Sequence, residues 1–285
     1  MSAPLIEPVA TPALLPLARF GVVFGWGLRR ALRTRKFLVT IVIAALAGAG
    51  LGASLAGQAD PARALWEFIH LAVLGTAVPL IALGLVGGGY GEEIQDQTLV
   101  FHLVRPVSRS TVYFARYAAG AVPGALCAAL MALLALVTSG VSLPTETIVG
   151  TVAVAVLGVV TIGAVYYALA SLFRRGLVAG LVYTFVVEGF FQLMPGSIQR
   201  LALTHHVRSV FHRLADDAFS ALSPRVANDV AAHASGIVTP RALRASLAEP
   251  WTSVEGALLL CGGVVLAALV LGAWTIRRRD YALKD

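Results

Sequence analysis

The run TIVGTVAVAVLGVVTIGAVYYALASLF, residues 147–173, contains no Asp, Glu, Lys or Arg. A helix needs about 20 predominantly apolar residues to cross the hydrocarbon core of a bilayer, and this run is long enough to do so. Runs of similar length without charged residues recur at residues 37–59, 68–91, 117–145 and 256–276, and residues 176–199 are interrupted only by Glu188. The sequence therefore predicts six membrane spans.

Composition supports the same class of protein. Hydrophobic residues make up 58% of the chain and charged residues 13%, whereas a soluble domain carries about 25% charged residues. The runs are continuous rather than alternating, and backbone groups in lipid must be paired within a segment, so helices are expected. We predict an all-α polytopic protein with one transmembrane domain over residues 1–285, and with spans at about 37–57, 66–90, 113–139, 147–172, 176–195 and 255–276.

The orientation follows from the basic residues, because Lys and Arg are enriched in short cytoplasmic loops. Most of them fall on one side of the predicted spans, within residues 29–36, 105–116, 174–175 and 277–284. The opposite side has Arg63 in its first short loop and no basic residue in the second. We therefore expect a multi-pass protein of the cytoplasmic (inner) membrane with both termini in the cytoplasm. An interfacial amphipathic helix starting near Leu17 is expected to lead into the first span.

Other uses of the charged and histidine residues are disfavoured. The net charge of +7 arises at membrane boundaries, which anionic lipid headgroups explain better than nucleic acid does. Glu67 and His70 form a single Glu-x-x-His pair without the second copy that a helix-bundle metal site uses. His205, His206 and His212 match no closed zinc site. We expect neither a metal site nor catalytic residues in this chain.

Residues 196–254 form the one long segment between spans, and we expect them on the outer side. Apolar residues from Val207 to Leu222 recur with a period near 3.6, with charged residues on other faces. This pattern predicts an amphipathic helix on the outer membrane surface, ending near Ser223-Pro224, and after it a loop with at most one short helix.

The polar segment GEEIQDQTLVFHLVRPVSR, residues 91–109, is far longer than a turn between two spans requires. Its acidic start suits the positive end of a short helix, and Pro106 stops that helix. Ser108 and the hydroxyl residues after it are candidates to cap the third span. We interpret the segment as a short cytoplasmic helix on which a partner docks.

At these residues the chain resembles the permease subunits of type-2 ATP-binding-cassette (ABC) exporters. That family has a glutamate pair, a Gly-Thr-Leu run, two leucines and a Pro-Val-Ser-Arg segment between its second and third spans. The matching residues here are Glu92, Glu93, Thr98, Leu99, Leu103 and Pro106 to Arg109. The departures are Gln97 for the glycine, Val104 for the second leucine and Arg116 for a lysine.

The resemblance implies a permease that pairs with a second permease subunit, identical or different, and with two separate ABC ATPase subunits. ATP and Mg would be bound by the ATPase and not by this chain, which has no Gly-x-x-x-x-Gly-Lys-[Ser/Thr] motif and is therefore not itself an enzyme. The residues expected to couple the two subunits are Glu92, Glu93, Thr98, Leu99, Leu103, Arg105, Pro106 and Arg109.

Two alternatives stay open. An acidic residue within a span is costly and is a functional candidate, so Glu188 could serve an ion-coupled secondary transporter, although the chain shows no internal repeat. Tyr166 and Tyr183 could line the same pathway or only pack, and Glu188 could have a local structural role. A membrane scaffold without transport activity also fits, whereas an intramembrane hydrolase would need motifs that the sequence lacks.

Overall fold

The computed structural model describes residues 16–88, 108–173, 175–191, 197–234 and 252–278. Within these ranges the chain is helical and contains no strand. Its elements are α1 (Pro16–Leu32), α2 (Arg35–Ala56), α3 (Pro61–Glu67), η1 (Phe68–Ala77), α4 (Val78–Ile81), η2 (Ala82–Gly87), α7 (Arg109–Thr138), α8 (Thr145–Leu172), α9 (Gly176–Tyr183), η3 (Thr184–Phe190), η4 (Ser197–Leu201), α11 (Leu203–Leu222), α12 (Pro224–Ala234) and α14 (Val254–Arg278).

In the part of the chain that the structure describes, five helices are long and apolar enough to cross a membrane, as expected of a multi-pass membrane protein. They are α2, the continuous rod Pro61–Gly87 formed by α3 to η2, α7, α8 and α14. The sixth span was expected at 176–195. The structure has a shorter apolar helix there, Gly176–Phe190, made of α9 and η3, so six spans stay a prediction.

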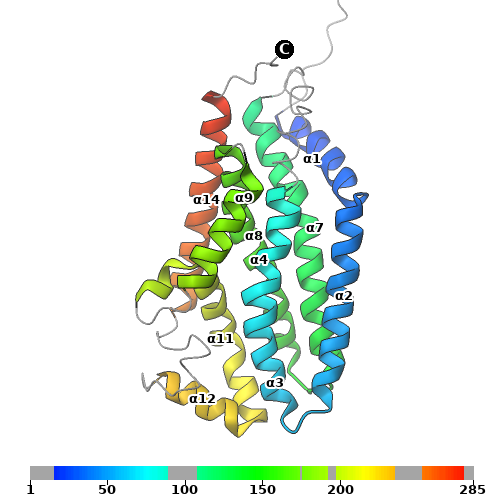
Figure 1. Cartoon of the computed structure of the whole chain (residues 1–285), viewed down its shortest axis with the longest axis vertical. Coiled ribbons are helices and arrows are strands. Elements are labelled where there is room, and N and C mark those ends of the chain that lie inside the picture. Colours follow the sequence, from blue (N-terminus) through cyan, green and yellow to red (C-terminus); the bar gives the residue numbers. More distant parts are fainter. Residues whose placement is uncertain (1–15, 89–107, 174, 192–196, 235–251, 279–285) are drawn as a thin grey trace, which may run out of the picture.

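The long helices run side by side along the molecule, and α7 and α8 form its centre (Figure 1). Helix α7 packs against α1, α2 and α8, and α8 packs against α11 and α14. The amphipathic helix α1, the start of α7 and the end of α14 lie at one end of the bundle, while α12 lies at the other (Figure 1). The two ends of the described chain thus lie at the same end of the molecule.

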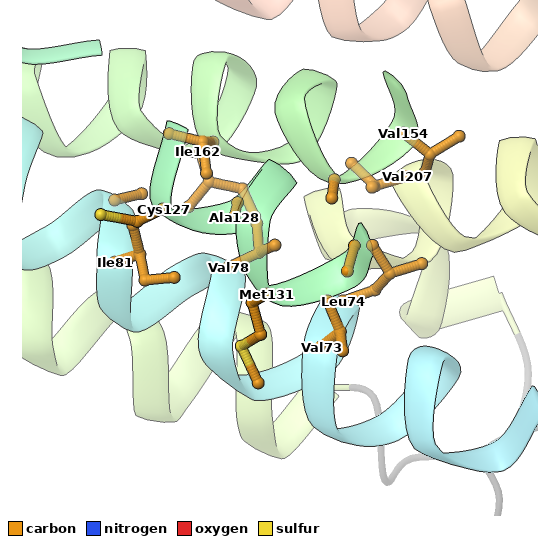
Figure 2. Close-up of a cluster of buried hydrophobic side chains, with 14 of the residues drawn as sticks. Val73, Leu74, Val78, Ile81, Cys127, Ala128, Met131, Val154, Ile162 and Val207 are labelled. Carbon is orange, nitrogen blue, oxygen red and sulfur yellow. The ribbon is translucent and has the colours of Figure 1, made fainter. Parts of the chain in front are cut away.

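The core consists mainly of small and branched aliphatic side chains. Figure 2 shows part of it, where side chains from the rod, α7, α8 and α11 meet. Val207 of α11 and Val78 of α4 both pack on Gly158 of α8. Such small residues let helix backbones approach closely, which is how helices associate in lipid.

The outer segment differs from its expected position on the membrane surface. Helix α11 packs against α8, α14, α12 and η1, and every residue from Leu203 to His212 is buried. The surface placement is therefore wrong for this half of the helix, because its polar side chains find partners inside the bundle. From Arg213 onward the helix is amphipathic, with Leu214 exposed and Phe219 buried. It ends at Leu222, as predicted.

Candidate functional site

The segment expected to couple to an ATPase lies mostly outside the described residues. This applies to Glu92, Glu93, Thr98, Leu99, Leu103, Arg105 and Pro106. Its last two residues are described. Ser108 is the N-cap of α7, and its Oγ accepts a hydrogen bond from the backbone N–H of Thr111 at 3.1 Å, which confirms the expected cap.

The residues directly after this segment join α7 to the end of α14. Arg277 of α14 donates from Nε to Oγ of Ser110 at 2.7 Å. Arg109 reaches the carbonyl oxygen of Ile276 at 3.5 Å. One turn earlier on α14, Gly272 lies directly against the Tyr113 hydroxyl. A displacement of the start of α7 would therefore act on α14 as well.

A second polar region follows one side of α11 inside the bundle. Thr204, Arg208, His212 and Asp216 are four residues apart in turn, so they lie on one stripe of the helix. We call these four residues the α11 polar stripe. Thr204, the first residue of the stripe, contacts Glu188 of η3. His212 and Asp216 contact residues of the rod Pro61–Gly87.

Glu188 is buried and accepts four hydrogen bonds. Its Oε1 accepts from the Tyr183 hydroxyl at 2.9 Å and from the backbone N–H of Leu203 at 3.1 Å. Its Oε2 accepts from the backbone N–H of Thr204 at 2.9 Å and from the hydroxyl of Thr204 at 2.7 Å. The first N–H groups of a helix have no partner within the helix and favour negative charge. Glu188 therefore caps α11 from a different helix, which is the local structural role left open by the sequence.

The structure brings the three pathway candidates together. The ring of Tyr166 meets the ring of Tyr183 edge to face, with centroids 5.9 Å apart. The Tyr166 hydroxyl lies 2.7 Å from Oγ1 of Thr184. Tyr166, Tyr183 and Glu188 thus form one cluster between α8 and the helix made of α9 and η3.

Arg208 is a charged residue that the sequence placed on a solvent-facing side of the helix. It is 5% exposed, and burial lowers its pKa to about 10, while the charge of Glu188 acts in the opposite direction. Its guanidinium lies directly against Gly75 of η1, where a Cβ would collide with Nη2. The signal that could have revealed the burial is the spacing of polar residues along α11 in steps of four.

Further along the stripe, two histidines distant in the sequence form a hydrogen bond. Nε2 of His212 lies 2.7 Å from Nδ1 of His70. Nδ1 of His212 lies 2.9 Å from Oδ1 of Asp216, which also accepts from the Trp66 indole at 3.0 Å. His70 thus contacts α11. Among the described residues, no group of three or more His, Cys, Asp or Glu could hold a metal ion.

Two π-helical stretches carry partners of the stripe. His70 and Gly75 lie in η1, and Glu188 lies in η3. A π-helix has a wider turn than an α-helix, and such turns occur frequently at functional sites. Both π-helical stretches thus lie beside buried polar groups of the bundle.

Near α12 the stripe is followed by partly buried polar contacts. Asp60 caps α3 by accepting from the backbone N–H of Arg63 at 3.2 Å, and its other oxygen accepts from the Ser223 hydroxyl at 2.7 Å. Arg63 also pairs with Asp229 of α12 at 2.9 Å. These contacts hold the junction of α11 and α12 to the loop after α2.

Asp60 should make the stability of the folded protein depend on pH in the acidic range. The hydrogen bond from Ser223 lowers the pKa of Asp60 below its ordinary value of 3.8. The contribution of Asp60 is therefore present above pH 3.8 and is lost as the pH falls through the lowered value. We expect the difference in Tm between the wild type and Asp60→Asn to shrink over that range, and Ser223→Ala to weaken the effect. A difference that stays constant with pH would contradict this account.

Comparison of the sequence with models of protein families and with curated proteins gave no match. The functional assignment therefore rests on this chain's own residues.

Proposed function

We propose that this chain is the transmembrane permease subunit of an ABC exporter. In this role it couples ATP hydrolysis by two separate ATPase subunits to movement of a substrate across the cytoplasmic membrane, together with a second permease subunit. The proposal is supported by the order and spacing of residues 92–109 and by the set of long apolar helices around them.

The observation that carries the proposal is the connection between α7 and α14. Ser108, near the end of the docking segment, caps α7, and the first turn of α7 is bonded to α14 through Ser110 and Arg277. Force applied by an ATPase to the segment would thus reach two long helices at once. ATP and Mg would act at the ATPase, while this chain supplies the docking segment and the membrane pathway.

An ion-coupled secondary transporter is the second candidate. The observation in its favour is the buried charge of Glu188 and Arg208 within the helix bundle, because such groups are rare there and mark ion pathways. The two functions differ in one measurable respect. Only the exporter requires an ATPase that copurifies with this chain in stable proportion.

Replacing Glu92, Glu93 and Arg105 together by alanine should weaken association with the cognate ATPase at least about tenfold. The expected reason is loss of the charged contacts at the docking segment, since truncating charged residues at an interface costs about 2 kcal/mol or more. The measurement is copurification, together with the ATPase activity of the assembled complex in lipid.

The matched control removes two acidic residues and one basic residue near α12 instead. Glu67, Asp229 and Arg63 form partly exposed ion pairs there, and exposed pairs contribute little to stability. The alanine variant of these three residues should retain association. Unchanged association and activity in the docking-segment variant would rule out the coupling role.

A further inference from the structure

The hydrogen bonds of the α11 polar stripe define where protons sit on the two histidines. An ionised carboxylate only accepts hydrogen bonds, so the contact at 2.9 Å requires Nδ1 of His212 to donate to Asp216. A neutral imidazole has one donor and one acceptor. Nε2 of His212 is therefore an acceptor, and Nδ1 of His70 donates to it at 2.7 Å. Both rings are then protonated on Nδ1, and Nε2 of His70 is the ring nitrogen that carries no proton.

We propose that Asp216, His212 and His70 form a binding site for one exchangeable proton. The proton binds Nε2 of His70 and makes that ring a cation. The Nδ1 proton of His70 then crosses the 2.7 Å hydrogen bond to Nε2 of His212. The positive charge thereby moves to His212, next to Asp216, and His70 becomes neutral again with its proton on Nε2. One proton enters, one positive charge is gained, and no other group changes its protonation.

The surroundings suit a proton better than a metal ion. A distance of 2.7 Å between the two ring nitrogens is that of a shared hydrogen, and it leaves no room for a cation between them. The Trp66 ring stacks on His70 with centroids 5.9 Å apart, and the rings of Trp66 and His212 form a T-shaped pair with centroids 5.1 Å apart. An aromatic face within about 6 Å stabilises a cation, so Trp66 favours the protonated state of the His70 ring that stacks on it.

The charges around His212 set the pH range in which the proton binds. Burial lowers the pKa of His212, the hydrogen bond and charge of Asp216 raise it, and the charge of Arg208 lowers it further. Glu188, which caps α11, is buried. The remaining charged residues on elements packed against α11 are exposed or only partly buried; among the described residues they are Arg63, Glu67, Glu146, Arg200, Arg225, Asp229, Glu255, Arg277 and Arg278. His212 is therefore protonated only in acidic conditions, below the ordinary histidine pKa of 6.5.

Proton binding also has a consequence for α11. Arg208 lies one turn before His212 on the same stripe, and like charges at this spacing repel. The unfolded chain takes up this proton at a higher pH than the folded chain does, so the contribution of His212 to stability is fully present above pH 6.5 and is lost as the pH falls through the lowered value. The site thus makes the packing of α11 sensitive to pH, whether or not the chain pairs with an ATPase.

The test is a pH titration of the full-length protein, labelled with ¹⁵N-histidine, in detergent or lipid discs. Above the titration range we expect both His70 and His212 to show the Nδ1-protonated tautomer. On acidification their signals should move together with one midpoint. Asp216→Asn should lower this midpoint by about one pH unit or more, since an adjacent carboxylate favours the charged imidazole by that amount.

His206→Gln is the matched control. His206 is also a buried histidine of α11, but its Nε2 contacts the carbonyl oxygen of Arg200 at 2.8 Å, so the variant should leave the midpoint unchanged. If Asp216→Asn does not fold, the tautomers and the shared midpoint of the wild type decide the question. Separate midpoints for the two rings, or an Nε2-protonated His212 above the titration range, would overturn the proposal.

Discussion

Glu188→Ala should destabilise the folded protein by about 3–5 kcal/mol, because breaking a buried charge pair leaves the remaining charge poorly compensated. The carboxylate accepts hydrogen bonds from Leu203, Thr204 and Tyr183. Its negative charge also acts on the buried guanidinium of Arg208. The substitution therefore removes the cap of α11 and a countercharge in one step. The measurement is thermal unfolding in a defined detergent.

Two further variants separate the cap from the charge. Glu188→Gln preserves the size of the side chain and a carbonyl acceptor, so it should lose less stability than Glu188→Ala. Combining Glu188→Leu with Arg208→Met should cost less than the sum of the single changes, because a buried charge pair replaced by apolar residues is often tolerated. Glu255→Ala, at an exposed acidic residue in the first turn of α14, should change stability by no more than about 0.5 kcal/mol. Additive losses in the double variant would show that the two charges do not interact.

The variant carrying Gly48→Leu and Gly52→Leu should separate α2 from α7. A Cβ at Gly48 would lie 2.5 Å from the carbonyl oxygen of Met131, and a Cβ at Gly52 would lie 2.9 Å from Cα of Ala135. Backbone atoms cannot move aside as a flexible side chain can, so the helices must shift apart. Overpacking costs about 1–3 kcal/mol at one site, and we expect at least the upper end of that range for the pair, measured as a fall in Tm.

The control for this variant lies between the two glycines. A Cβ at Gly50 would meet no atom within 4 Å, so Gly50→Leu adds the same apolar side chain to the same helix without a clash. It should change the free energy of unfolding by no more than about 0.5 kcal/mol relative to the wild type. Equal losses from Gly50→Leu and Gly52→Leu would mean that the effect does not arise from the contact with α7, because leucine has a higher helix propensity than glycine. The close approach also brings Thr138 to the carbonyl oxygen of Ala49 at 3.2 Å.

Local features of the chain were readable from the sequence. The positions of the long apolar helices follow from runs without charge, because each run must be helical by itself in lipid. The cap at Ser108 and the end of α11 before Ser223 were also predicted correctly, since both depend on neighbouring residues and backbone preferences.

The depth of α11 in the bundle could not be predicted in the same way. Its sequence has an amphipathic pattern, which normally indicates a helix at a surface. The pattern was misleading because it counts Arg208 and His212 as solvent-facing, whereas the bundle supplies Glu188, His70 and Trp66 around them. A polar residue is buried only where partners exist, and these partners come from other helices.

The sequence by itself determined that this is a helical membrane protein, where its long apolar helices run and where a partner is expected to dock. Hydropathy and capping act over a few residues, so they can be read along the chain. Only the tertiary structure decided that His70 meets His212, 142 residues further along, and that Glu188 caps a helix that begins 15 residues after it. Such contacts depend on how closely the helices pack, and that is set by small residues such as Gly75 and Gly158, which make room for the side chains of α11.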